Sequence, residues 1–112
     1  MSIQETTGAP HARIYGIGAY RPSRVIPNSE VIDAIDSSDE WIQQRSGIKQ
    51  RRWATPEETV QLMSVAAAHQ ALERSGVDAR QIDCVIVATV SHMFQTPAIA
   101  TAIAHELSLI HI

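Results

Sequence analysis

A tryptophan and an arginine, spaced four residues apart, are the side chains whose types and spacing best suit binding chemistry. Trp41 and Arg45 lie in a segment with a helical pattern, so the two share one helix face. An indole beside a guanidinium can clamp a flat aromatic ring by stacking and by cation–π contact, and the guanidinium also attracts phosphate. An adenine nucleotide offers both groups. Taken alone, however, the pair favours a simpler interpretation, a partly exposed tryptophan that rests on the arginine stem.

Candidates for a nucleophile, a general base or a metal ligand are weaker. The one cysteine, Cys84, falls inside the most apolar segment and is predicted to be a buried, inert thiol. His92 follows the end of that segment, where loops often carry chemistry, but it has no acidic or cysteine partner nearby. No histidine pair has the spacing of metal ligands, so no metal site is predicted. We expect ordinary helix or surface histidines at His69, His105 and His111.

Two glycines in an apolar segment invite a dinucleotide-binding interpretation, which we disfavour. Gly16 and Gly18 end a short apolar run, but the third glycine of a G-x-G-x-x-G pattern would fall on Arg21. No helix pattern follows directly. We therefore expect a strand end whose backbone packs closely against a neighbouring element.

The composition is that of an ordinary globular chain. Of its 112 residues 45% are hydrophobic and 19% charged, which predicts one domain with a modest core and argues against disordered and collagen-like classes. The net charge of −3 gives no reason to expect a nucleic-acid partner, and Lys49, Arg51 and Arg52 are expected to form a solvated face. The N-terminus lacks the apolar run of a secretory signal, and residues 84–90 are too few to span a bilayer, so we expect a cytoplasmic protein.

Three segments have strand patterns. Residues 12–19 form a short apolar run that ends before Pro22, and residues 49–54 are basic and then apolar, as in an edge strand. Residues 83–90 have the clearest pattern. They are apolar on both faces rather than alternating, which is typical of a central strand in a covered parallel sheet.

Two short helices are predicted between the first two strand segments. Asn28 is expected to cap one that runs to about Ile35. Ser37 and Glu40 have the spacing of a capping box, so another helix is expected from there, with Gly47 as its stop.

Two further helices are predicted in the second half of the chain. One has Pro56 at its first position and runs to about Ser75, with Gly76 as its C-cap. The last covers residues 98–107 and is opened by Pro97. This order of strands and helices predicts a layered α/β architecture.

Several of these segments together resemble one family. Residues 37–48 read S-S-D-E-W-I-Q-Q-R-S-G-I and resemble the S-D-E-W-I-x-x-R-(T/S)-G-I signature of 3-oxoacyl-ACP synthase III. Residues 14–22 are similar to the opening strand of that family, and residues 88–91, followed by Pro97, resemble its A-T-x-S…P-x-x-A segment. The three matches stand in the family's order over residues 12–107.

The resemblance implies a thiolase-like layered α/β fold, of which this chain would form only the opening part of the first half. It implies a flexible N-terminus over residues 1–11, the N-terminal part of a condensing-enzyme domain over residues 12–107, and an atypical C-terminal end over residues 108–112. The family condenses an acyl-CoA primer with malonyl-ACP to initiate fatty-acid synthesis, usually as a homodimer. Acyl-CoA is a substrate there, and no further cofactor is implied.

The family's catalytic residues have no counterpart in this sequence. The family uses a cysteine in an A-A-C-(A/S)-G motif, followed far along by a histidine and an asparagine. No such motif occurs here, and Cys84 and His92 match neither role. We therefore predict no catalytic residue, and we expect this chain alone to be inactive and poorly stable, because a partly formed sheet leaves apolar faces uncovered.

The resemblance implies that this chain contains residues of the family's coenzyme A entrance. Trp41 and Arg45 match the pair that sandwiches the adenine of CoA, which shifts our preference from the simpler interpretation to binding. Ser37 matches a hydroxyl near the same ligand, although helix capping explains it equally well. Thr96 matches a position that lines the acyl pocket of the partner subunit, where threonine leaves room for a longer or branched primer. Two alternatives stay open: a sibling that primes polyketide synthesis or acylates another acceptor, and a non-catalytic CoA-binding module.

Overall fold

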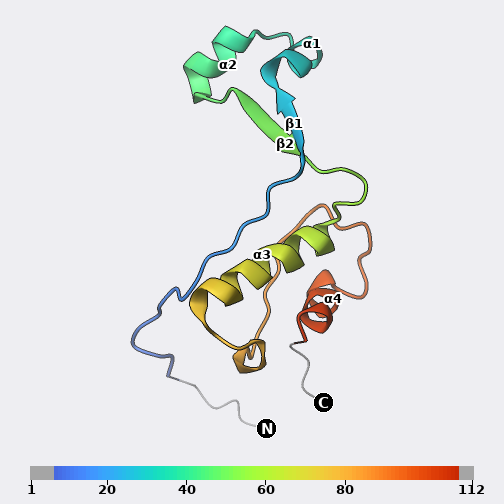
Figure 1. Ribbon diagram of the computed structural model, residues 1–112. Coiled ribbons are helices and arrows are strands. Elements are labelled where there is room, and N and C mark those ends of the chain that lie inside the picture. Colours follow the sequence, from blue (N-terminus) through green and yellow to red (C-terminus); the bar gives the residue numbers. More distant parts are fainter. Residues whose placement is uncertain (1–6, 109–112) are drawn as a thin grey trace.

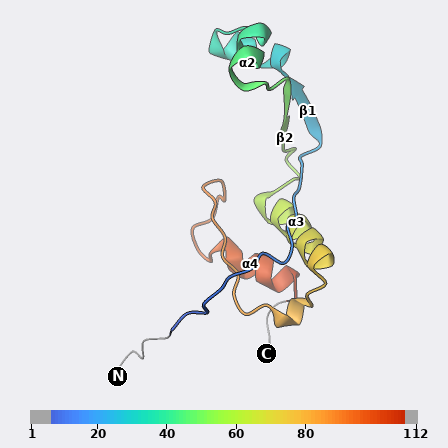
Figure 2. The same cartoon turned by 90° about the vertical axis from the view of Figure 1, so that its left-hand side faces the viewer.

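Two lobes follow one another in an elongated molecule of 59 × 33 × 33 Å, of which the computed structural model describes residues 7–108 (Figure 1). The lobes stay apart in the view turned by 90° (Figure 2). The hairpin lobe comprises β1 (Arg24–Pro27), η1 (Asn28–Glu30), α1 (Ile32–Ile35), α2 (Asp39–Ser46) and β2 (Gln50–Trp53). The helical lobe comprises α3 (Val60–Ser75), η2 (Ala79–Gln81) and α4 (Ile99–Glu106).

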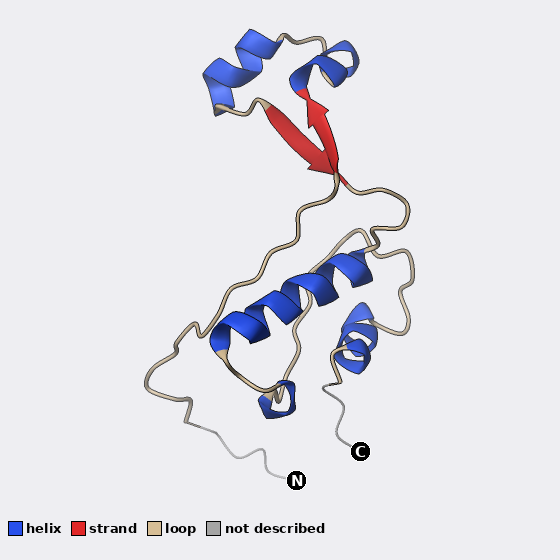
Figure 3. Cartoon of the chain, in the orientation of Figure 1, coloured by secondary structure: helices blue, strands red, loops and turns tan. Residues whose placement is uncertain are grey.

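A two-stranded antiparallel sheet supports the hairpin lobe, and it is the only sheet within residues 7–108 (Figure 3). β1 pairs with β2 so that Arg24 lies opposite Trp53 and Ile26 opposite Arg51. Ile26 is fully buried and anchors the ladder. The expected edge strand over residues 49–54 is confirmed as β2. β1 was not predicted, because four residues with one buried position carry little periodicity.

The connection from β1 to α2 differs from its prediction. Asn28 does not cap a helix: Pro27 holds the position before η1, and no side chain caps that turn. Instead, Asn28 is buried and donates hydrogen bonds from its side-chain amide. The predicted helix is broken into η1 and the single turn α1, which ends at Asp36 with a positive φ of 47°.

α3 starts later than predicted. Thr59 caps it, since its hydroxyl oxygen accepts from the backbone N–H of Leu62 at 3.1 Å, and no helix begins at Pro56. The preceding turn is held by Glu58, whose carboxylate accepts hydrogen bonds from the backbone N–H of Thr55 at 3.0 Å, from Ser23 and from the hydroxyl of Tyr20. These bonds, that from Tyr20 first, lower the pKa of Glu58 to about 2. They fasten the segment before β1 to the start of α3.

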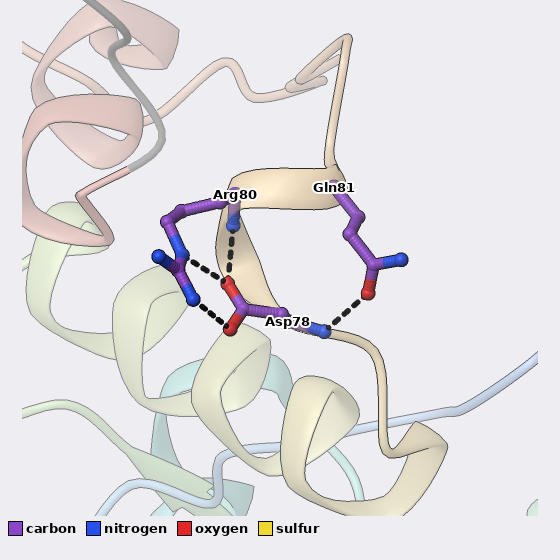
Figure 4. Close-up of polar contacts among 3 residues, drawn as sticks. All are labelled: Asp78, Arg80 and Gln81. Atoms are coloured by element: carbon purple, nitrogen blue, oxygen red, sulfur yellow. Dashed lines mark hydrogen bonds and ion pairs between the residues drawn. The ribbon is translucent and has the colours of Figure 1, made fainter.

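The end of α3 agrees with its prediction. The helix stops at Ser75, and Gly76 adopts a positive φ of 69° as its C-cap. η2 then turns the chain. The carboxylate of Asp78 accepts hydrogen bonds from the backbone N–H of Arg80 at 2.8 Å and from the guanidinium of Arg80 at 3.0 Å (Figure 4). The side-chain oxygen of Gln81 accepts from the backbone N–H of Asp78. The hydrogen bonds from Arg80 lower the pKa of Asp78 to about 2.

The strand predicted over residues 12–19 is not formed, because no strand lies beside it in the described part of the chain. This segment runs along α3 instead (Figure 1). An added Cβ would lie 1.9 Å from the Ala67 carbonyl oxygen at Gly18 and 2.5 Å from that of Ala71 at Gly16. The expected close backbone packing of these glycines is therefore confirmed, and the neighbouring element is a helix.

The strand predicted over residues 83–90 is also not formed. Val85 and Val87 pack against the core, whereas Ile86 is 90% exposed and Cys84 is exposed. A strand requires hydrogen-bond partners in a neighbouring strand, and none lies beside this segment within residues 7–108. The prediction of a buried Cys84 is wrong for the same reason: the face on which it lies has nothing packed over it.

The core of the helical lobe lies between α3 and α4. Val65 packs there with Ile99, Ile103 and Leu107. The predicted last helix is confirmed to within one residue at each end. The accessible surface is 9515 Å², against about 6,100 Å² for a compact protein of this mass. Much apolar surface therefore stays open, as expected for a partly formed layered sheet.

No described helix combines the length and the apolar character that crossing a membrane requires. The predicted N-terminus over residues 1–11 and C-terminal end over residues 108–112 fall mostly outside the described residues, as does His111. The division into these segments remains a prediction.

Replacing Gly18 by alanine should loosen the hold of residues 12–19 on α3, since the added Cβ would meet the Ala67 carbonyl at 1.9 Å. We expect the free energy of unfolding to fall by about 2 kcal/mol. Gly8→Ala is the matched control, because nothing lies within 4 Å of a Cβ there. Urea denaturation measures both; equal stability of the two variants would contradict the packing described.

Candidate functional site

Helix α2 carries the candidate binding pair, and its two ends are well defined. The hydroxyl oxygen of Ser38 accepts a hydrogen bond from the backbone N–H of Trp41 at 3.2 Å. Asp39 and Glu40 lie in the first turn, where their negative charges interact favourably with the positive end of the helix dipole. Gly47 closes the helix with a positive φ of 72°, as predicted. The predicted cap at Ser37 is wrong by one residue.

Trp41 and Arg45 share one face of α2, as their spacing predicts. The guanidinium carbon of Arg45 lies 5.6 Å from the centroid of the Trp41 ring, within cation–π range. Trp41 is 54% exposed, so part of its ring is open to a ligand. The geometry fits both interpretations of the pair, and the surroundings of Trp41 must decide between them.

A surface hollow of about 570 Å³ lies next to Trp41, lined also by Ile35, Asp36, Ser37 and Ser38. The hydroxyl oxygen of Ser37 is buried, and it finds no hydrogen-bond partner among the described residues. A buried hydroxyl without a partner is costly. Ser37 does not cap α2, because the hydroxyl of Ser38 does so, and its own hydroxyl therefore stays without a partner among the described residues.

The acids of α2 are engaged elsewhere. Asp39 accepts from the side-chain amide of Gln43 at 2.8 Å and from Asn28 at 2.7 Å, and these bonds lower the pKa of Asp39. Glu40 accepts from Gln44 at 3.1 Å. Arg45 forms no ion pair within the part of the chain that the structure describes. Its charge is therefore available to an anionic ligand.

Other predicted candidates lie apart from this hollow. Thr96 is exposed in the loop before α4 and does not line it. His92 packs its ring against Phe94, with centroids 5.8 Å apart. Cys84 is exposed in a segment without regular structure, and it does not line the hollow either. No cluster of three metal-binding side chains occurs within residues 7–108.

A second tryptophan–arginine pair was missed by sequence reasoning. Arg24 of β1 lies over the ring of Trp53 of β2, 5.7 Å from its centroid, and also pairs with Glu30 at 3.4 Å. The two residues are far apart in the chain and meet only through the β1–β2 register, which has no sequence signal when β1 itself is not predicted. Neither residue lines the hollow beside Trp41.

Known proteins of one kind match nearly all of this chain, although no family model matches it. β-Ketoacyl-acyl-carrier-protein synthase III 1 of Streptomyces coelicolor is 59% identical over 105 residues, which are 94% of this chain and 31% of that protein. The mycobacterial β-ketoacyl-acyl-carrier-protein synthase III of Mycolicibacterium paratuberculosis is 45% identical over the same share of the chain.

The chain belongs to the β-ketoacyl-acyl-carrier-protein synthase III family. Among solved structures, the priming β-ketosynthase of the R1128 polyketide pathway matches 87% of the chain and 29% of its own, with a TM-score of 0.81 and 50% identity. The synthase III of Aquifex aeolicus matches 86% of the chain and 31% of its own, with a TM-score of 0.78 and 36% identity. The predicted thiolase-like α/β fold class is confirmed, and the chain spans about a third of the length of these synthases.

Exchanging the two neighbouring serines separates capping from ligand contact. Ser38→Ala removes the cap and should lower the free energy of unfolding of the hairpin lobe by about 1 kcal/mol. Ser37→Ala removes a buried hydroxyl without a partner and should leave stability unchanged or higher. Hydrogen exchange of the α2 amides measures both; a larger loss in Ser37→Ala would contradict the capping described.

Proposed function

We propose that this chain provides the coenzyme A entrance of a condensing acyltransferase, which joins an acyl-CoA primer to malonyl-ACP and so initiates fatty-acid synthesis. The observation that carries the proposal is the cation–π pair of Trp41 and Arg45 beside a hollow that Trp41 and Ser37 both line. Family membership supports the same reaction class.

Each of the three residues has a defined part in this proposal. The adenine of CoA stacks on the exposed face of Trp41. Arg45 supplies the positive charge that an adenine nucleotide bearing phosphates requires, and its lack of an ion pair within residues 7–108 supports this. Ser37 donates its hydroxyl hydrogen to, or accepts from, a polar group of the nucleotide. CoA enters as the carrier of the substrate, so no separate cofactor or metal is required.

The chemical step lies outside these 112 residues in our proposal. An acyl-enzyme held as a thioester needs a cysteine thiolate, and Cys84 is the only cysteine of the sequence. Cys84 does not match the family's nucleophile motif, and it lies exposed in a segment without regular structure. We therefore expect the isolated chain to bind CoA without forming an acyl thioester. The proposed whole protein acts as a cytoplasmic homodimer and has no nucleic-acid or membrane partner.

A polyketide-priming role is the second candidate, because a priming β-ketosynthase is among the similar solved structures. The priming β-ketosynthase of the R1128 pathway shares 50% identity with this chain, above the 36% of the Aquifex aeolicus synthase but below the 59% of the Streptomyces coelicolor synthase III. The two roles use the same acyl-CoA entrance and differ in the acceptor. A non-catalytic CoA-binding module is the remaining alternative, which a cooperative melt of the isolated chain together with tight CoA binding would support.

Removing the indole of Trp41 tests the proposed entrance. Trp41→Ala should weaken CoA binding at least about tenfold, because base–aromatic stacking is lost. Trp53→Ala is the matched control: it removes the other tryptophan that lies under an arginine, away from the hollow. Isothermal titration of both variants with CoA provides the comparison. Equal losses in the two variants, or none in either, would refute the proposal.

Enlarging Thr96 tests the proposed acyl pocket. Thr96 is exposed in this chain, so its side chain is free to face a second subunit. In the full-length protein, Thr96→Phe should shorten the primers that are accepted, because a phenyl ring fills the space that threonine leaves. Primer-length profiling measures this, with Thr96→Val as the size-conserving control. An unchanged profile in Thr96→Phe would show that this position does not limit primer length.

A further inference from the structure

A buried side-chain amide lies behind helix α2. Asn28 is 1% exposed and is the one buried polar residue of the described chain. Buried amides of this kind are costly unless each of their hydrogen-bonding groups has a partner. The partners of Asn28 therefore indicate what the residue does.

Every side-chain group of Asn28 is used. Its amide nitrogen donates to the carboxylate of Asp39 at 2.7 Å and to the carbonyl of Ile48 at 2.8 Å. Its side-chain oxygen accepts from the guanidinium of Arg51 at 2.6 Å. Its backbone N–H donates to the carbonyl of Lys49 at 3.2 Å. One residue thus joins η1 to α2, to the loop after it and to β2.

The two acceptors of the amide lie on either side of one short helix. Asp39 is the first residue of α2, and Ile48 follows its C-cap, Gly47. Both acceptors meet at one nitrogen atom, so the amide ties the first residue of α2 to the loop after the helix and holds both against η1. Trp41 and Arg45 lie between those ends. A change at Asn28 would therefore turn their shared face relative to the hollow.

We propose that Asn28 is a positioning residue for coenzyme A binding: it holds α2 at both ends and so sets the direction in which Trp41 and Arg45 face. Asn28 does not line the hollow, so it acts only through α2. This inference rests on the function proposed above, but its structural part can be tested without a ligand.

The geometry distinguishes this role from simple filling of the core. A filling role depends on volume, and asparagine and aspartate have nearly equal volumes. Asn28→Asp keeps the acceptor for Arg51 but replaces the donor to Asp39 and Ile48 by an oxygen, so that two carboxylates face each other. Asp39→Asn keeps an oxygen that accepts from Asn28. Combining the two changes restores one donor and one acceptor between positions 28 and 39, with the roles exchanged.

The experiment compares these three variants with the unchanged chain. We expect Asn28→Asp to weaken CoA binding at least about tenfold, Asp39→Asn to stay within about threefold, and the double variant to recover to within about fivefold of the unchanged chain. Such rescue requires that the two side chains act as a pair. Unchanged binding in Asn28→Asp, or a double variant as weak as Asn28→Asp, would overturn the inference.

Two ligand-free readouts keep this test separate from the proposed function. Hydrogen exchange reports whether the α2 amides open, and Trp41 emission in a Trp53→Phe background reports whether Arg45 still lies over the indole. Both should change in Asn28→Asp and return in the double variant, even if the single change unfolds the hairpin lobe. If the unchanged chain binds no CoA while this pattern holds, the proposed function fails, and only the structural part of the inference stands, namely that Asn28 sets the orientation of α2. If neither readout responds to Asn28→Asp, the positioning role fails.

Discussion

The hydrogen bonds at the two ends of α2 are the constraint on which the candidate site depends. An isolated helix of eight residues has little stability in water, because its few backbone hydrogen bonds do not offset the conformational entropy lost in forming the first turn. Here the Ser38 hydroxyl caps the N-terminus, Gly47 closes the C-terminus, and the buried amide of Asn28 joins both ends to the sheet. Without these bonds, Trp41 and Arg45 would have no fixed geometry.

The helical lobe shows the opposite situation, in which strong sequence patterns lack their partners. Residues 83–90 have the composition of a strand covered on both faces, yet only Val85 and Val87 pack against the core. Residues 12–19 find a partner in α3, because Gly16 and Gly18 allow backbone contact with the helix. The family members that match this chain are about three times as long.

Local signals in the sequence were sufficient for the glycine stops of two helices and for pairs set by helical spacing. Gly47 and Gly76 were predicted as helix stops, α4 was predicted to within one residue at each end, and the Trp41–Arg45 pairing follows from helical spacing alone. Several neighbouring side chains can accept the capping hydrogen bond of a helix, and the cap of α2 was predicted one residue too early. At α3 the carboxylate of Glu58 holds a turn where the first helical turn was predicted. Tyr20 and Ser23, which are distant in the chain, donate hydrogen bonds to this carboxylate and so stabilise the turn.

Contacts between distant residues could not be predicted. Asparagine is a common residue at helix caps, so the sequence predicted that role for Asn28. Only the folded chain brings Asp39, Ile48 and Arg51 around it. The Arg24–Trp53 contact and the exposed Cys84 likewise depend on which strands pair and which do not. The role that we propose for Trp41 combines both kinds of information: a local pair, and a hollow beside it that Asp36 and Ser37 also line.

The most direct test of the account follows the two indole N–H signals of the ¹⁵N-labelled chain by NMR during titration with coenzyme A. The sequence has two tryptophans, so each signal is assigned by one substitution to phenylalanine. We expect the Trp41 signal to shift in a saturable way while the Trp53 signal stays in place. A shift of Trp53 alone, or of neither indole at saturating coenzyme A, would contradict the claim that the Trp41–Arg45 face is the entrance for the coenzyme.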